Sequence, residues 1–246
     1  MNLKERYTRV LDELVNAAAA ANRRASDINL IAVSKTHPVA LVDELAALGQ
    51  VDFGENRIAE LVDKQATTTA AGLRWHLIGQ LQTNKVKLLT ADVLLHTLDR
   101  LSLAEKLQQK FGGQEAPKSA ADRMSSGLQT GDTKQKIEAL IQVNCSREPN
   151  KSGVAPEDFD ALCEAVAAMP AIQVTGLMTI AENSDDEKTV RSAFALLREL
   201  SEKTRARGIF AGYQGILSMG MSGDFALAIA EGATHVRIGS AIFGSR

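Results

Sequence analysis

Eight short apolar runs recur along the 246-residue chain, and stretches with helical spacing lie between them. Their shortness and their β-branched residues are typical of parallel strands that are buried on both faces. The runs are Leu30–Val33, Val51–Phe53, Trp75–Ile78, Val93–Leu95, Ile137–Val143, Ile172–Leu177, Gly215–Leu217 and His235–Ile238. Eight strands, each followed by a helix, predict an α/β fold, a single (β/α)8 barrel that spans residues 1–246.

A doubly wound open sheet is the alternative fold, but it usually has fewer strands and often a glycine-rich first turn. The first turn here, SKTHP, has no glycine. The barrel is therefore the better prediction.

The spacing predicts helices over Pro38–Leu48, Pro156–Met169 and Glu187–Arg207, with both prolines in first turns and with Gly49 and Gly208 as stops. An extra amphipathic N-terminal helix is predicted within residues 3–24. Its expected apolar face consists of Leu3, Tyr7, Val10, Leu11, Leu14, Val15 and Ala18. Residues 112–136 are polar, rich in Gly and Ser and without apolar period, which we interpret as a flexible insertion.

The composition excludes several classes of function. The net charge is −2 and aromatic residues make up 4% of the chain, which argues against binding to nucleic acid or a membrane surface. No run of 18 apolar residues could span a bilayer, and no Cys/His cluster has zinc spacing. Two cysteines are too few for a disulfide framework, so we expect a cytoplasmic protein without a metal.

In a barrel of this kind the active site lies where the strands end, so the residues that follow each strand are the candidates. The first strand leads to Lys35. The loops after the seventh and eighth strands read SMGMSGD and RIGSA, and they supply small residues, hydroxyls and backbone N–H groups. These two loops often hold a phosphate in such barrels, although Ser222 could equally be the N-cap of a helix over Asp224–Ala230.

A lysine across the barrel mouth from a phosphate site has three readings. It can hold pyridoxal 5′-phosphate (PLP) as a Schiff base, bind a sugar phosphate directly, or form a salt bridge with Glu55. Spacing alone leaves these open. Lys151, in the sequence NKSG, is a second candidate amine. Its simpler interpretation is a solvated charge in a loop. We also expect a local Glu55–Arg57 ion pair and place His96 and His235 in the core or at its rim, hydrogen-bonded.

The motifs taken together resemble the pyridoxal phosphate homeostasis protein family. They are AVSKTHP, FGENR, RWHLIGQLQTNKVK, HTLDR, IQVN with KSG, GLMTI and LSMGMSGDFALAIAEGATHVRIGSAIFG, and they run from about Lys4 to Gly244. The resemblance implies the barrel of alanine racemase's cofactor domain. Departures from the family pattern include Gln80 in place of a histidine and Arg147 in place of a glycine.

The resemblance also implies a role for each site residue. Lys35 carries PLP as a Schiff base. The phosphate cup consists of Ser218, Met219, Ser222, Gly239 and Ser240. The ring or pocket is lined by Asn56, His76, Met178 and Arg237. Among these, Arg237 is the best candidate for contact with the pyridine nitrogen.

Three functions compete: a PLP carrier, an amino acid racemase and a phosphate-sugar enzyme. A two-base racemase needs a second base opposite the lysine. Similar racemases take a tyrosine from a C-terminal domain, but this chain ends seven residues after Gly239 and its two tyrosines, Tyr7 and Tyr213, lie elsewhere in the sequence. We therefore expect a monomeric carrier that buffers PLP for vitamin B6 and amino acid homeostasis and hands it to apo PLP-dependent enzymes, with little or no catalysis.

Overall fold

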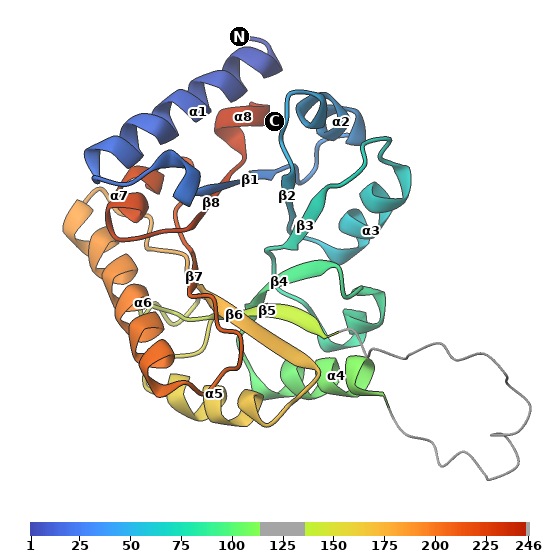
Figure 1. Ribbon diagram of the computed structural model, residues 1–246, viewed down its shortest axis with the longest axis vertical. Coiled ribbons are helices and arrows are strands. Elements are labelled where there is room, and N and C mark those ends of the chain that lie inside the picture. Colours follow the sequence, from blue (N-terminus) through green and yellow to red (C-terminus); the bar gives the residue numbers. More distant parts are fainter. Residues whose placement is uncertain (114–135, 245–246) are drawn as a thin grey trace, which may run out of the picture.

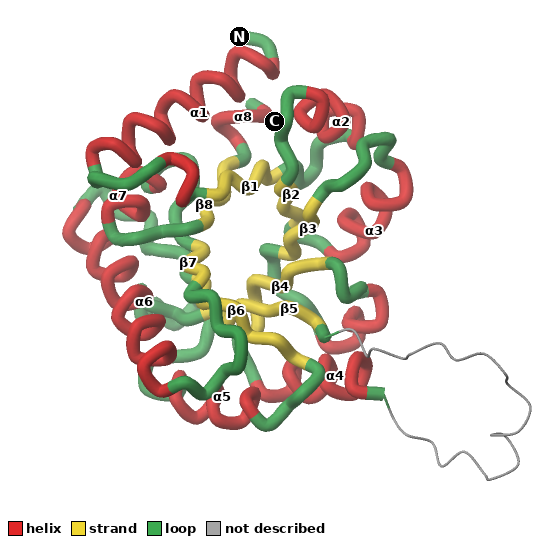
Figure 2. Tube along the Cα trace, in the orientation of Figure 1, coloured by secondary structure: helices red, strands yellow, loops and turns green. Residues whose placement is uncertain are grey.

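The computed structural model describes residues 1–113 and 136–244. In this part of the chain eight parallel strands form a closed barrel in sequence order, with helices around the outside (Figures 1 and 2). The strands are β1 (Asn29–Val33), β2 (Asp52–Glu55), β3 (Arg74–Leu77), β4 (Val93–Leu98), β5 (Ile137–Gln142), β6 (Ile172–Met178), β7 (Ile216–Ser218) and β8 (His235–Ile238). The predicted (β/α)8 barrel is confirmed.

The helices differ from the prediction mainly at their ends. They are α1 (Leu3–Ala20), α2 (Val39–Ala47), α3 (Ile58–Thr67), α4 (Leu101–Gly112), α5 (Phe159–Ala167), α6 (Glu187–Arg207), α7 (Phe225–Ala230) and α8 (Ser240–Phe243), with short 3₁₀ turns η1 (Ala25–Asp27) and η2 (Thr83–Leu88). After β3 the connection is η2, so one of the eight expected α-helices is replaced by a 3₁₀ helix. Pro38 occupies the N-cap of α2, and Pro156 precedes the Asp158 N-cap of α5, so neither lies in a first turn as predicted.

Helix α1 packs against α7 and α8 with a narrower apolar face than predicted. Its buried residues are Leu3, Tyr7, Val10, Leu14 and Ala18. Leu11 and Val15 are 36% and 51% exposed, which corrects the prediction that they belong to the buried face. Each follows a buried position by one residue, and a step of 100° around the helix turns its side chain toward solvent.

The predicted insertion at 112–136 falls largely outside the described residues, since 114–135 are not described. Gly112 is the last residue of α4, and Lys136 leads directly into β5. The flexibility of the segment stays a prediction. No helix in the described ranges is both long and apolar enough to cross a membrane.

The sheet register sorts side chains between the inside and the outside of the barrel, because alternate residues of a strand share a face. A cavity of about 580 Å³ opens at the end where the strands begin. It is lined by the first residues of six strands, namely Asn29, Asp52, Arg74, Val93, Ile216 and His235. Ser218 and Arg237, which are two residues beyond Ile216 and His235, therefore face the barrel interior nearer the opposite end.

Candidate functional site

The C-terminal ends of the strands bring most of the predicted site residues to one end of the barrel. Lys35 follows β1 by two residues, Asn56 follows β2 directly, and Met178 and Ser218 end β6 and β7 and are paired with each other. Arg237 pairs with Ile31, which is four residues before Lys35 on the neighbouring strand. At about 3.3 Å per residue, Arg237 lies roughly 13 Å deeper along the strands than Lys35.

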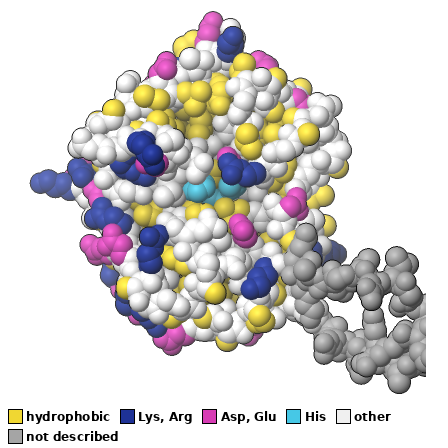
Figure 3. Space-filling model, in the orientation of Figure 1, with side chains coloured by type: hydrophobic (Ala, Val, Ile, Leu, Met, Phe, Trp, Pro, Cys, Tyr) yellow, Lys and Arg dark blue, Asp and Glu magenta, His cyan; other side chains and the backbone are white. Residues whose placement is uncertain are grey.

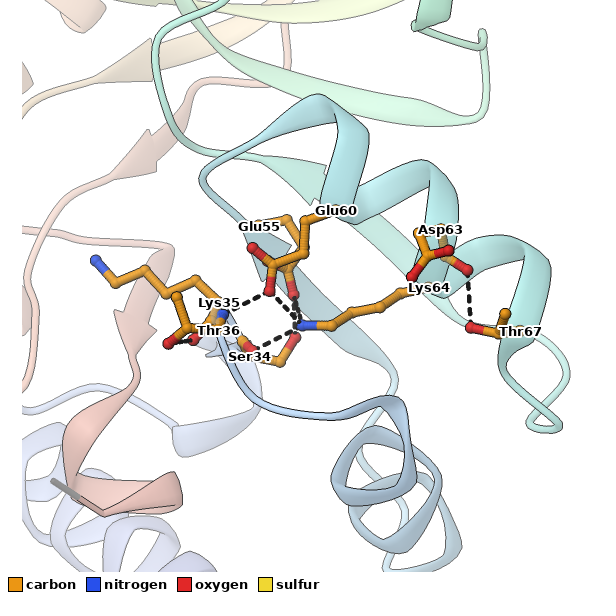
Figure 4. A network of polar contacts seen from close by, with 8 residues as sticks. All are labelled: Ser34, Lys35, Thr36, Glu55, Glu60, Asp63, Lys64 and Thr67. Carbon is orange, nitrogen blue, oxygen red and sulfur yellow. Dashed lines mark hydrogen bonds and ion pairs between the residues drawn. The ribbon is translucent and has the colours of Figure 1, made fainter. Parts of the chain in front are cut away.

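The backbone around Lys35 is held in an unusual shape by a polar cluster (Figure 4). Thr36 has a left-handed backbone, with φ of 65°, which is rare for a β-branched residue. Its N–H donates to Glu60 Oε1 over 2.5 Å, and its hydroxyl donates to the Lys35 carbonyl over 2.6 Å. The half-buried Lys35 side chain points away from this cluster. The corner thus holds the lysine backbone while leaving its amine outside the cluster.

The centre of this cluster is a buried ion pair that the sequence did not predict. Lys64 Nζ lies 2.6 Å from Glu55 Oε1 and also donates to the Ser34 carbonyl over 2.8 Å. The Glu55 side chain is 0% exposed, and its Oε1 also accepts from the Ser34 hydroxyl. Burial raises the pKa of Glu55, and the bonds from Lys64 and Ser34 only partly offset that effect. The expected Glu55–Arg57 ion pair is therefore wrong, as is the reading in which Lys35 pairs with Glu55.

The loops after β1 and β8 touch each other at the mouth. The rings of His37 and Phe243 stack with centroids 5.0 Å apart. A Cβ on Gly239 would approach the Val33 carbonyl oxygen to 3.1 Å, so the two backbones run close together. The Lys35 loop consequently adjoins the loop that carries Gly239 and Ser240.

The two loops predicted to hold phosphate also meet. Ser240 Oγ lies 3.4 Å from Ser222 Oγ, and both side chains reach solvent. Ser222 is not the N-cap of α7: that position belongs to Asp224, whose carboxylate accepts from the Met221 N–H over 2.5 Å. The Ser222 and Ser240 hydroxyls and the backbone of Gly239 therefore form one polar rim.

Ser218 and Met219, in contrast, are engaged within the protein. Ser218 Oγ accepts from Arg237 Nη1 over 2.7 Å, and the Met219 N–H donates to the His235 carbonyl over 3.1 Å. Both residues are 0% exposed. Their placement supports Arg237 and the β7–β8 loop rather than a phosphate at the surface.

Arg237 is a buried cation without a carboxylate in contact. Its side chain donates to Ser218 Oγ and, over 3.0 Å, to the Thr179 carbonyl. A guanidinium has five N–H donors, so three remain, and the described residues offer them no acceptor. Burial lowers the pKa of Arg237 to about 10, which leaves it cationic at neutral pH. These three open donors fit an acceptor on a molecule bound in the mouth.

Two further predicted residues differ in how they are placed. Met178, which is 0% exposed, ends β6 beside Ser218 and could provide an apolar wall. Asn56 is half-buried at the mouth, and Gly79 packs so closely on it that an added Cβ would lie 2.1 Å from the Asn56 carbonyl oxygen. The segments that follow β2 and β3 can approach this closely only because residue 79 is glycine.

His76 is not at the mouth, which corrects the expectation that it lines the cofactor pocket. Its Nε2 lies 2.9 Å from Asp52 Oδ1, and its Nδ1 lies 2.9 Å from His96 Nε2. Both ring nitrogens are thus bonded to protein groups, and the residue lines the cavity at the N-terminal end. His96 and His235 are hydrogen-bonded interior residues as predicted.

Neither tyrosine is placed to act on a substrate beside Lys35. The Tyr7 hydroxyl donates to Gln50 Oε1 over 3.0 Å, beneath α1. The Tyr213 hydroxyl lies 2.8 Å from Ser201 Oγ on α6, just before β7 begins. Burial raises the pKa of Tyr213 to about 12, which makes it a poor base at neutral pH.

Sequence reasoning missed Lys64, Asp52 and the part that His96 plays. Lys64 lies on α3, and its position nine residues after Glu55 brings it back over the strand end. The signal for Asp52 and His96 was strand alternation, since each is in phase with inward-facing residues of its strand.

Comparison with known proteins gives a consistent result. The family model described as alanine racemase, N-terminal domain, matches residues 11–246. A Pseudomonas aeruginosa protein named pyridoxal phosphate homeostasis protein is 39% identical over 99% of this chain and 96% of its own length. The protein of that name from Escherichia coli K12 is 36% identical over 100% of this chain and 97% of its own length. The structure of PipY from Synechococcus elongatus with PLP bound is 32% identical, covers 94% of this chain and 100% of its own, and superimposes with a TM-score of 0.74.

Proposed function

The chain belongs to the pyridoxal phosphate homeostasis protein family, and we propose that it binds PLP at the mouth of its barrel, buffers it and delivers it to other proteins. The observation that carries this proposal is the meeting of three groups at one end of the barrel. They are the Lys35 amine, the hydroxyl rim of the β7 and β8 loops, and the open donors of Arg237.

Lys35 would hold the cofactor through a Schiff base. Its amine condenses with the PLP aldehyde, a C=N bond forms and water leaves. The cluster around Glu55 and Lys64 supports this role by holding the backbone on both sides of Lys35. The lysine can then stay mobile at its tip while its base does not move.

The phosphate would lie on the rim formed by Ser222, Gly239 and Ser240. Two hydroxyls 3.4 Å apart can donate to two oxygens of one phosphate. The rim adjoins the Lys35 loop through the His37–Phe243 stack, so one small molecule can reach both. Ser218 and Met219, which are buried and bonded elsewhere, contribute to the support of this rim.

The ring would lie over Met178, with Asn56 at its edge and Arg237 near its nitrogen. The chemistry that PLP supplies when bound is withdrawal of electrons into its ring, which is strongest when the ring nitrogen is protonated. A cationic donor facing that nitrogen opposes its protonation. Arg237 would thus bind the ring while lowering its reactivity.

We infer a carrier rather than a racemase from the placement of Tyr7 and Tyr213. A racemase of this type requires a second base on the far side of the substrate from the lysine. Both tyrosines are bonded to protein groups elsewhere. The relatives are named for homeostasis rather than for a reaction. We further propose a monomer that acts in the cytoplasm and hands PLP to apo-enzymes.

An absorption spectrum of the purified protein with added PLP tests the proposal. We expect a visible band from the cofactor, its loss in Lys35→Ala, and its retention in Lys151→Ala, the matched control for the second candidate amine. A band that survives Lys35→Ala would overturn the assignment of Lys35. Racemisation of amino acids at rates typical of an enzyme, on the order of 1 per second or more, would overturn the carrier proposal.

A further inference from the structure

A line of hydrogen-bonded side chains runs through the interior of the barrel. It begins at Asp52 on β2, passes through His76 on β3 and His96 on β4, and reaches Ser218 on β7 and Arg237 on β8. The four steps measure 2.9, 2.9, 2.9 and 2.7 Å between heavy atoms. All five residues are at most 6% exposed. This column joins the N-terminal cavity to the cation beneath the mouth.

The column has one consistent direction when both histidines are neutral. The Asp52 carboxylate only accepts, so His76 must donate to it from Nε2. His76 Nδ1 then accepts from His96 Nε2, and His96 Nδ1 accepts from the Ser218 hydroxyl. Ser218 Oγ is left to accept from Arg237. Each proton has one place, and every bond points from the cation toward the anion.

Electrostatics support the two ends of this arrangement. Burial raises the pKa of Asp52, but bonds from His76 and Arg74 outweigh that effect and leave the pKa below its ordinary value. Burial, together with the nearby His76 and Arg237, holds the pKa of His96 well below its ordinary value, which keeps that ring neutral. Arg237 has no carboxylate in contact: Asp224 acts on it without a hydrogen bond and raises its pKa, while Asp52 is the anion at the far end of the column.

The Asp52 end is open to the N-terminal cavity. Asp52, Arg74, His76 and His235 all line it, and Figure 3 shows histidine side chains in the middle of one face, with charged side chains of both signs beside them. Arg74 bonds to the second carboxylate oxygen of Asp52 over 2.5 Å. The anchor of the column is therefore held by an exposed arginine and by no group from the mouth.

We propose that Asp52, His76, His96 and Ser218 act as a positioning relay that orients Arg237 toward the cofactor from the opposite end of the barrel. The relay engages one of the five Arg237 donors through Ser218, the Thr179 carbonyl engages a second, and the remaining three are left for the mouth. This inference rests on the proposed function for its cofactor part. Its hydrogen-bond part stands without any cofactor.

The first test is nitrogen-15 NMR of the histidine rings in the cofactor-free protein at neutral pH. We expect His76 and His96 both to carry the proton on Nε2. A proton on Nδ1 of either ring would overturn the relay. That nitrogen would then donate its hydrogen bond rather than accept one, so the proposed direction of the bonds between His76 and Ser218 would not hold. This result does not depend on whether the protein binds PLP, so it separates failure of the relay from failure of the proposed function.

The second test compares variants loaded with PLP. His96→Leu breaks the column, while His96→Gln keeps one donor and one acceptor. Thr175→Val is the matched control, because Thr175 is a buried barrel residue whose hydroxyl has no partner among the described residues. We expect His96→Leu to weaken PLP binding about tenfold or more, because a displaced Arg237 would lose the hydrogen bond from its charged guanidinium to the cofactor. His96→Gln should recover most of this loss.

The readout specific to positioning is the pH dependence of the bound cofactor's absorption. With Arg237 displaced, the ring nitrogen can take up a proton, so His96→Leu should show a spectral transition between about pH 5 and 8 that the parent protein and Thr175→Val lack. If His96→Leu binds PLP as tightly as Thr175→Val and its spectrum does not change with pH, the relay is refuted. Should His96→Leu fail to fold, Asp52→Asn serves in its place, with a smaller loss of the same kind expected.

Discussion

Replacing Lys64 with methionine should remove a large part of the protein's stability, although the residue lies in the last turn of a surface helix. Methionine keeps the length of the side chain and deletes the charge. Glu55 would then be a 0%-exposed carboxylate whose remaining hydrogen bond comes from Ser34. Removing one partner of a buried ion pair typically costs about 3–5 kcal/mol. That is a large share of the roughly 5–15 kcal/mol by which domains are stable.

Urea unfolding followed by circular dichroism measures this loss as a change in the free energy of unfolding. The matched control is Lys203→Met, because Lys203 pairs with Asp160 at the surface, where the two side chains are 52% and 43% exposed. Exposed pairs contribute about 0–1 kcal/mol. The double variant Glu55→Gln with Lys64→Met should recover part of the loss, since no charge is then left buried.

The loss should also depend on pH. Without Lys64 the pKa of Glu55 rises further above its ordinary value of 4.5, because burial is no longer offset by the ammonium. The folded state then binds a proton that the unfolded state releases, so stability rises as the pH falls from 7 toward 5. A loss for Lys64→Met that matches Lys203→Met and does not change with pH would refute the buried-pair argument.

Three other predictions concern residues outside the proposed cofactor site. Arg147→Gly should stabilise the protein by up to about 1 kcal/mol, because Arg147 has a left-handed backbone with φ of 58°. A lower free energy of unfolding in urea would contradict this and would mean that the ion pair between Arg147 and Glu157 contributes more. Burial lowers the pKa of His235 to about 4, so an NMR titration should show it neutral down to about pH 5. Because the folded state disfavours the protonated ring, the free energy of unfolding should decrease as the pH falls from 6.5 through 4, and an ordinary titration near 6.5 would contradict this. Burial raises the pKa of Cys145 to about 11 and that of Cys163 to about 12, so a thiol reagent at pH 8 should label neither until urea unfolds the protein, and rapid labelling of the folded protein would contradict their burial.

The barrel was predictable because each strand is a short apolar run and the runs number eight. The strand from His235 to Ile238 and the helix from Glu187 to Arg207 have the predicted bounds. Most other boundaries coincide or differ by one to three residues, because capping and hydrogen bonding rather than hydrophobicity decide where an element ends.

The site was predictable only in part. Strand counting places Lys35, Ser222 and Ser240 at one end of the barrel, as the structure does. It could not tell how deep a residue lies within a strand, so it gave no ground to correct the pocket position that the resemblance implies for His76. Nor could it assign partners to charges, so Glu55 was paired with its neighbour in sequence rather than with Lys64, one helix away.

The role of Arg147 shows how a departure from a family pattern acquires a physical meaning. The family pattern has a glycine at this position, and the backbone of residue 147 lies in the left-handed region of φ. Glycine adopts that conformation without a steric cost, whereas arginine does not. Local backbone geometry, which no hydrophobic pattern reports, therefore explains the glycine of the family pattern at this position.

Borohydride reduction of the protein with bound PLP, followed by peptide mass spectrometry, is the most direct test of the central claim. Reduction makes the bond between lysine and cofactor permanent, so the labelled residue can be identified. We predict one label per chain, on the peptide that contains Lys35, and no label at that position in Lys35→Ala. A label that maps to Lys64 or Lys151 instead, or the absence of any label at saturating PLP, would contradict the account.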